Sequence, residues 1–145
     1  MKNSNSNSYH QLIEYDKQQL ILLLDPIVDI HYVNFQQTEI YSKIHDLTDT
    51  LNYVEQDILV KEIRNHFGTF IYDLSKLCPK ITPTEIVVCC LWFRFPIRKI
   101  ALCLGYPYTE PVRKHKSRIR KKLTVMTDSS FLFDFIFSNR FHSTN

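Results

Sequence analysis

The sequence predicts an all-α fold, with long helices in its N-terminal half followed by a small helical domain in its C-terminal half. Only two of the 145 residues are glycine, too few for the many turns of an all-β fold. Apolar residues recur at helical spacing, as at Ile40, Ile44 and Leu47, which share one stripe of a helix. Threonine and proline also stand where helices begin, as at Thr82-Pro83.

The N-terminal half predicts a tail and then helices. Residues 1–8 are polar and rich in Asn and Ser, which predicts a disordered tail. Amphipathic spacing predicts three helical stretches, at about residues 9–24, 27–47 and 53–77. Asp25-Pro26 separates the first two, Gly68 weakens the third, and Cys78-Pro79 ends it. We expect residues 9–78 to form a helical dimerisation or interaction region.

The C-terminal half has clearer start and stop signals. Helices are predicted at about residues 82–93, 97–104, 109–124 and 131–137. Thr82 and Glu85 have the spacing of a capping box, Gly105 ends the second of these helices, and Thr109-Glu110-Pro111 begins the third. A helix, a glycine, a short turn and a second capped helix predict a helix-turn-helix between about Thr82 and Leu123. We expect residues 79–138 to form this small domain, followed by a tail at residues 139–145.

Charge is distributed unevenly along the chain. The formal net charge is only +3, but residues 1–77 hold 6 lysines and arginines against 11 acidic residues. Residues 78–145 hold 12 against 4. An acidic half joined to a basic half suggests that one end of the molecule meets a polyanion and the other does not.

Residues 111–123 concentrate this positive charge. Seven of these thirteen residues are lysine or arginine. Val112, Ile119 and Leu123 stand at positions i, i+7 and i+11, so they share one stripe that anchors the helix to a core. The other faces then present a cationic surface, and such a surface gains free energy on duplex DNA by releasing condensed counterions. A basic helix that is merely solvated is the alternative interpretation.

Three stretches of the C-terminal half carry a family pattern, namely Ile81-Thr82-Pro83-Thr84-Glu85-Ile86, Lys99-Ile100-Ala101-Leu102-Cys103-Leu104-Gly105, and Val112 to Leu123. Through them residues 81–123 resemble the DNA-binding domain of the LuxR/FixJ family, which is related in shape to region 4 of sigma factors. The whole chain also resembles Bacteroidetes regulators that join a helical segment to such a motif. In contrast to the family pattern, the link from Arg94 to Lys99 lacks the usual glycine and glutamate.

The resemblance implies that residues 110–123 form the recognition helix in the major groove. Transferred by position, Arg113, Lys114 and Ser117 are expected to contact bases or lie close to them. Four further cations are expected to contact phosphates: Lys116, Arg120, Lys121 and Arg98. His115 has two interpretations, as a DNA contact or as a residue at the edge of the core.

We therefore expect a sequence-specific transcriptional regulator that binds double-stranded DNA as a homodimer, with a further partner in the transcription machinery possible. The alternative is a protein-interaction module whose helix-turn-helix is degenerate and binds a regulatory partner instead of DNA. No enzymatic motif, cofactor motif or metal-ligand spacing is found in the sequence. The absence of an apolar leader or span predicts a cytoplasmic protein without membrane contact.

Three groups of residues are expected to have structural roles. The cysteines at 78, 89, 90 and 103 do not form paired metal-binding motifs and are expected as small core residues. Trp92, Phe93 and Phe95 are expected to pack in the core. The acidic residues are expected to lie solvated on helix faces.

Overall fold

A computed structural model describes residues 30–127 and 130–138, and in these ranges the chain is helical without strands, as predicted. Residues 30–35 are helical. They are followed by α2 (Glu39–His45), α3 (Tyr53–His66), α4 (Gly68–Leu77), α5 (Pro83–Trp92), α6 (Ile97–Cys103), α7 (Glu110–Thr127) and α8 (Phe131–Ile136). The predicted tails at residues 1–8 and 139–145 and the predicted helix at 9–24 lie outside the described residues.

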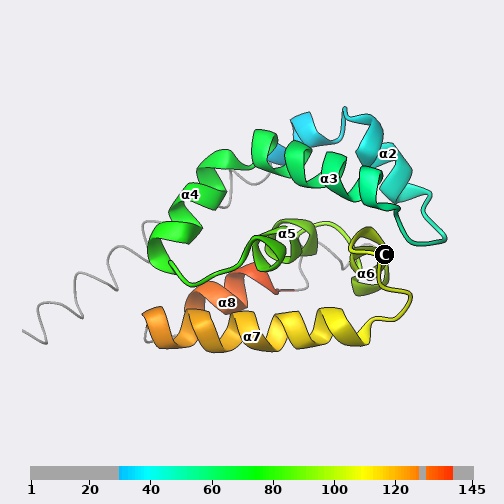
Figure 1. The fold of residues 1–145 in the computed structure, drawn as a ribbon. Helices are drawn as coiled ribbons and strands as arrows, with labels where there is room; N and C mark the ends of the chain where they lie inside the picture. Colours follow the sequence, from blue (N-terminus) through cyan, green and yellow to red (C-terminus); the bar gives the residue numbers. More distant parts are fainter. Residues whose placement is uncertain (1–29, 128–129, 139–145) are drawn as a thin grey trace, which may run out of the picture.

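The helices stack in layers (Figure 1). Helices α2, α3 and α4 form the upper layer in this view, α5 and α6 the middle, and α7 with α8 the lower. Helix α7 packs against α5, α6 and α8, while α3 contacts α5. Within residues 30–127 and 130–138, every helix is too short or too polar to span a lipid bilayer.

The N-terminal half has more breaks than the sequence predicted. The predicted helix at 27–47 is wrong as one element, because Thr38 begins α2 anew by accepting a hydrogen bond on its side chain from the Tyr41 N–H (3.2 Å). The predicted stretch at 53–77 is divided at Phe67, where φ is −107°. The Phe67 ring is fully buried and packs edge-on against Tyr32 and Phe35. The direction of α4 therefore follows from core packing.

The C-terminal half begins and ends its helices close to the predicted positions. The capping box is present: Thr82 accepts from the Glu85 N–H (3.2 Å), and the Thr82 N–H donates to the Glu85 carboxylate (2.8 Å). Gly105 has φ +82° and follows α6, as a C-terminal glycine does. Helix α7 begins at Glu110 as predicted and extends to Thr127, beyond the predicted end near residue 124.

One continuous core joins the two halves of the chain. The Tyr32 hydroxyl donates to the Cys90 carbonyl, and the rings of Phe70 and Phe93 lie 5.6 Å apart. All four cysteines are buried with free thiols, and Trp92, Phe93 and Phe95 are buried, as predicted. The upper helices therefore support the position of α5 and, through it, of α7.

The two glycines should respond oppositely to alanine. A Cβ at Gly68 meets nothing within 4 Å, so Gly68→Ala should stabilise the fold by about 0.4–1 kcal/mol by restricting the unfolded chain. A Cβ at Gly105 would lie 2.7 Å from Gln56 Nε2, in a backbone conformation that alanine disfavours by about 1–2 kcal/mol. Gly105→Ala should therefore destabilise it. Urea unfolding followed by circular dichroism measures both, and equal signs would contradict this account.

Candidate nucleic-acid interface

Helix α7 is fixed to the molecule along one stripe. Val112, Ile119 and Leu123 have no exposed surface, which confirms the predicted inner stripe. At its start, the Thr109 carbonyl accepts hydrogen bonds from the Val112 and Arg113 N–H groups (3.0 and 3.1 Å). The helix is therefore held along much of its length, and its rotation about its own axis is set by the core.

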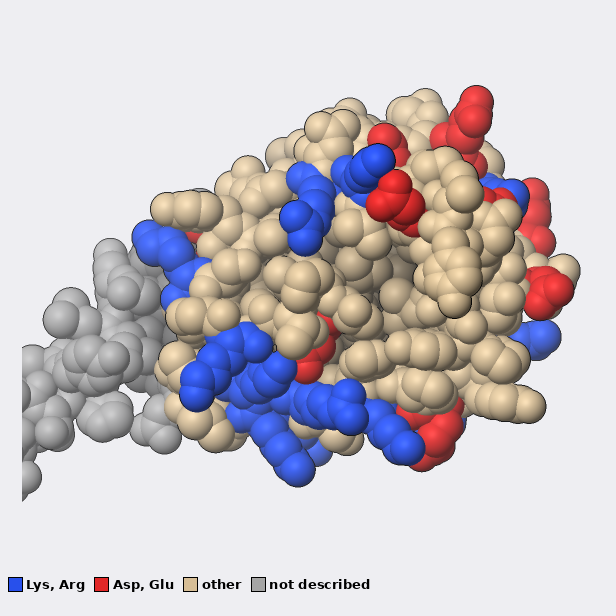
Figure 2. Space-filling view, viewed as in Figure 1, with Lys and Arg blue, Asp and Glu red and all other residues tan. Residues whose placement is uncertain are grey.

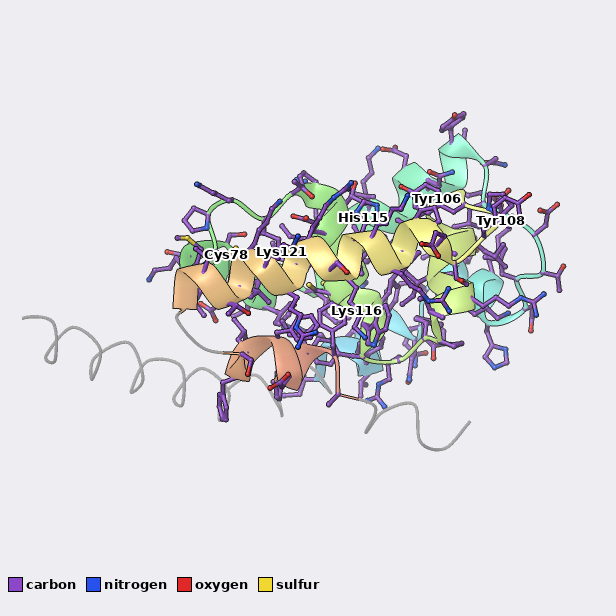
Figure 3. The ribbon with its side chains drawn as sticks, turned by 90° about the horizontal axis from the view of Figure 1, so that it is seen from below. Cys78, Tyr106, Tyr108, His115, Lys116 and Lys121 are labelled. Carbon is purple, nitrogen blue, oxygen red and sulfur yellow. The ribbon has the colours of Figure 1, made fainter. Side chains whose placement is uncertain are left out.

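The opposite face of α7 is basic and open. We call it the basic face, and it is lined by Glu110, Arg113, Lys114, Ser117, Arg118 and Lys121. All six lie in the exposed or part-exposed surface of the helix, at the i, i+3, i+4, i+7 spacing of one face. Figure 2 shows lysine and arginine side chains in a band along α7. Figure 3 looks at this helix from below, and no other described element crosses it.

The predicted base contacts Arg113, Lys114 and Ser117 all lie on the basic face. The Arg113 guanidinium donates to the Thr109 hydroxyl (2.6 Å), which holds this side chain near the first turn of the helix. The predicted phosphate contact Lys121 shares the same face one to two turns later. Arg98 is exposed at the start of α6, on a separate element.

Two of the predicted phosphate contacts lie on the flank of α7 that meets α8. Lys116 Nζ lies 4.8 Å from the ring centroid of Trp92 and 5.5 Å from that of Phe137. Burial lowers the pKa of Lys116, and nearby Arg120 lowers it further. The Arg120 guanidinium carbon lies 5.5 Å from the Phe133 ring centroid. Both cations thus already have aromatic partners, which interact with them favourably.

The other flank of α7 contacts α5 and the turn after α6. Lys122 Nζ lies 2.7 Å from the carboxylate of Glu85, which is only 2% exposed. The expectation that all acidic residues are solvated is therefore wrong for Glu85, because the helix cap and Lys122 together satisfy its charge. His115 Nε2 lies 3.1 Å from the Tyr106 hydroxyl, and the two rings stack. In Figure 3 Lys116 and His115 lie on opposite sides of α7.

Burial lowers the pKa of His115, and the charge of Arg118 lowers it further while Glu85 opposes the shift. The half-buried, hydrogen-bonded ring favours the interpretation of His115 as a residue at the edge of the core. Its neutral form is the one that this environment stabilises.

Arg118 belongs to the basic face, although it is not among the DNA contacts predicted from the sequence. It stands four residues after Lys114 and three before Lys121, so helical spacing alone places it on their face. That signal could have found it. By contrast, nothing local to α7 indicates that Lys116 and Arg120 meet the aromatic side chains of α5 and α8.

No protein-family model, curated protein or solved structure matches this chain. The LuxR/FixJ resemblance consequently remains a prediction from the sequence. Among the described residues no group of three or more His, Cys, Asp or Glu side chains is arranged to hold a metal ion.

Stability should depend on the ionisation of Glu85. Burial alone would raise the pKa of this carboxyl, but hydrogen bonds from Lys122 and Thr82 outweigh it and lower the pKa below the usual 4.5. A carboxyl with a lowered pKa contributes stability above its unfolded pKa and loses it as the pH falls through its folded pKa. The free energy of unfolding should therefore fall as acid is added below about pH 4.5.

Urea unfolding of the natural protein and of Glu85→Gln between about pH 7 and pH 3 measures this contribution, because the other ionisable groups are common to both. The difference between the two proteins should shrink towards the acidic end. A difference that stays constant with pH would mean that the Glu85 carboxylate has no special ionisation in the folded state.

Proposed function

We propose that this protein binds duplex DNA through the basic face of α7 and acts as a transcriptional regulator. The observation that carries the proposal is the opposition of two faces on one helix. Val112, Ile119 and Leu123 are fully buried, whereas the opposite face presents four exposed cations and a serine with no described element over them. An α-helix with its side chains fits the major groove of B-DNA, and its cations release counterions from the phosphates.

The surrounding helices are arranged in support of this role. Helix α5 contacts α6 and α7, and α6 contacts α7 across a turn that begins at Gly105. A helix, a short turn and a second helix held on a common core is the arrangement in which helix-turn-helix proteins present their recognition helix. The fixed rotation of α7 directs the cationic side outward.

The positions on the basic face suggest a division of roles. Arg113, Lys114 and Ser117 lie in the first half of α7, which enters deepest into the groove in this docking mode. The Arg113 guanidinium is suited to bidentate contact with guanine. The Ser117 hydroxyl can donate a hydrogen bond to a base edge or accept one from it. Arg118 and Lys121 come later along the helix, where phosphates of the groove walls are closer.

We further propose that two copies act together, since a single recognition helix gives little affinity at physiological salt. Three apolar side chains near the start of α3 are available for this contact, because Tyr53, Val54 and Ile58 are 89%, 70% and 45% exposed. Sedimentation of the free protein and of its DNA complex measures the number of copies.

The test is a fluorescence-anisotropy titration of random-sequence duplex DNA across a salt series. Micromolar binding is expected, with the logarithm of the association constant falling by about 3 to 4 for each tenfold rise in salt, if the four cations of the basic face each displace counterions. A selection from random sequences then identifies the site. A folded, helical protein that shows no binding at low salt contradicts the proposal and favours the interaction-module alternative.

A further inference from the structure

Two adjoining hollows separate the upper helices from α5 and α6. One lies between α3, α5 and the turn after α6 and holds about 310 Å³; the other lies between α3, α4 and α5 and holds about 370 Å³. They share Pro83 and Val87 as a common wall. Figure 2 shows this face hollowed in uncharged surface above the basic band of α7. Sites for small molecules in proteins span about 300–1,000 Å³.

The second hollow is the more apolar of the two, and Ile63, Ile71 and Ile86 line it. The first hollow is of mixed character, because Gln56, Thr84 and Tyr106 lie in its wall beside Leu59, Val60 and Leu104. In that wall Gln56 Nε2 donates to the Leu51 carbonyl (2.8 Å), and the Tyr106 hydroxyl is paired with His115. The second hollow therefore suits an apolar chain better than the first does.

The second hollow provides the charge. Among the residues that line the two hollows, Arg64 is the charged one, and it lies in the second hollow together with Ser75. Arg64 is exposed, and within residues 30–127 and 130–138 no carboxylate lies at ion-pair distance from it. A guanidinium beside a hydroxyl is a donor set that matches a carboxylate.

We propose that the second hollow binds a small amphiphile with an aliphatic chain and a carboxylate head group, the head at Arg64 and Ser75 and the chain along Ile63, Ile71 and Ile86. The size favours a small molecule over a helix of a partner protein. One helical turn with its side chains is about 5 Å long and 10 Å across, and so fills about as much space as either hollow. A hollow therefore holds no more than about one turn of a partner helix. This site is separate from the basic face, and its occupation does not depend on DNA binding.

The experiment is isothermal titration calorimetry of the full chain with dodecanoate below its micelle concentration, beside dodecyltrimethylammonium as a probe of equal chain and opposite charge. Saturable binding at one site is expected, with dodecanoate bound at least roughly tenfold more tightly because only its head pairs with a guanidinium. Absence of binding, or equal affinity for both probes, would overturn the proposal.

Two variants locate the site. Arg64→Gln should weaken dodecanoate roughly tenfold, whereas Lys61→Gln, on the same helix but outside the hollows, should leave it unchanged. Gly68 lines the second hollow, and a Cβ there meets nothing within 4 Å, so Gly68→Leu should obstruct the hollow and abolish binding while the fold is kept. Helicity and melting temperature verify folding, and dodecanoate binding that is insensitive to either Arg64→Gln or Gly68→Leu would show that the site is misassigned.

Discussion

Replacing Lys122 by methionine should lower the free energy of unfolding by about 3 kcal/mol, the lower end of the range for breaking a buried ion pair by removing one partner. The Glu85 carboxylate would remain, 2% exposed, with its helix-cap hydrogen bond but without its counter-charge. The lower end is appropriate because the Lys122 side chain is 29% exposed, so solvent already screens the pair in part. Methionine keeps most of the aliphatic packing, so the loss reports the charge.

The neighbouring lysine is the matched control for this experiment. Lys121 lies on the basic face and is exposed, so Lys121→Met should change the free energy of unfolding by no more than about 0.5 kcal/mol. The double variant Glu85→Gln/Lys122→Met should recover part of the loss, since no charge is left buried. Equal effects of Lys121→Met and Lys122→Met in urea unfolding would refute the assignment of a buried pair.

Features decided by a few neighbouring residues could be predicted from the sequence. The capping box of Thr82 and Glu85, the left-handed Gly105 and the buried stripe of α7 were all predicted, because each depends on helical spacing or on the conformational range of one residue. The helical character of the described chain follows from the same local signals.

Features decided by residues far apart in the sequence could not be predicted in this way. The apolar spacing of residues 53–77 runs on through Phe67, and the break there comes from packing against Tyr32 and Phe35. Lys122 finds its partner 37 residues away, at Glu85. Periodicity contains no information on such partners, which only the packed helices bring together.

The same distinction applies within the candidate interface. The charge of residues 111–123 predicted a cationic helix, but it did not separate cations that face solvent from cations that rest on aromatic rings. Lys116 is placed over Trp92 and Phe137, and Arg120 over Phe133, by the return of α8 onto α7. The structure therefore assigns the flank cations partners within the protein.

Removing three cations from the basic face should nearly abolish DNA binding without unfolding the protein. In the variant Arg113→Ala/Lys114→Ala/Lys121→Ala, three exposed charges are lost from the face opposite the buried stripe. If each displaces about 0.9 counterions, the salt dependence should flatten by about 2.7 and the affinity at about 0.1 M salt should fall roughly 10²–10³-fold. Anisotropy titrations across a salt series measure both.

The control for this variant has the same loss of charge outside the basic face. Lys43, Lys61 and Lys76 lie on α2, α3 and α4, and their joint replacement by alanine should leave the salt dependence nearly unchanged. A comparable loss of affinity in this control would mean that net charge, and not the basic face, attracts DNA.

Single replacements then test the assignment within α7. Arg118→Ala should weaken DNA binding and reduce the salt dependence by about 0.9, because Arg118 is on the basic face. Lys116→Ala should act mainly on stability, since the amine rests on the Trp92 and Phe137 rings. Arg113→Ala should cost about 1–3 kcal/mol of binding and relax specificity at one base pair if it reads a guanine. Equal losses of affinity from Lys116→Ala and Arg118→Ala would mean that DNA also contacts α7 along the flank that meets α8.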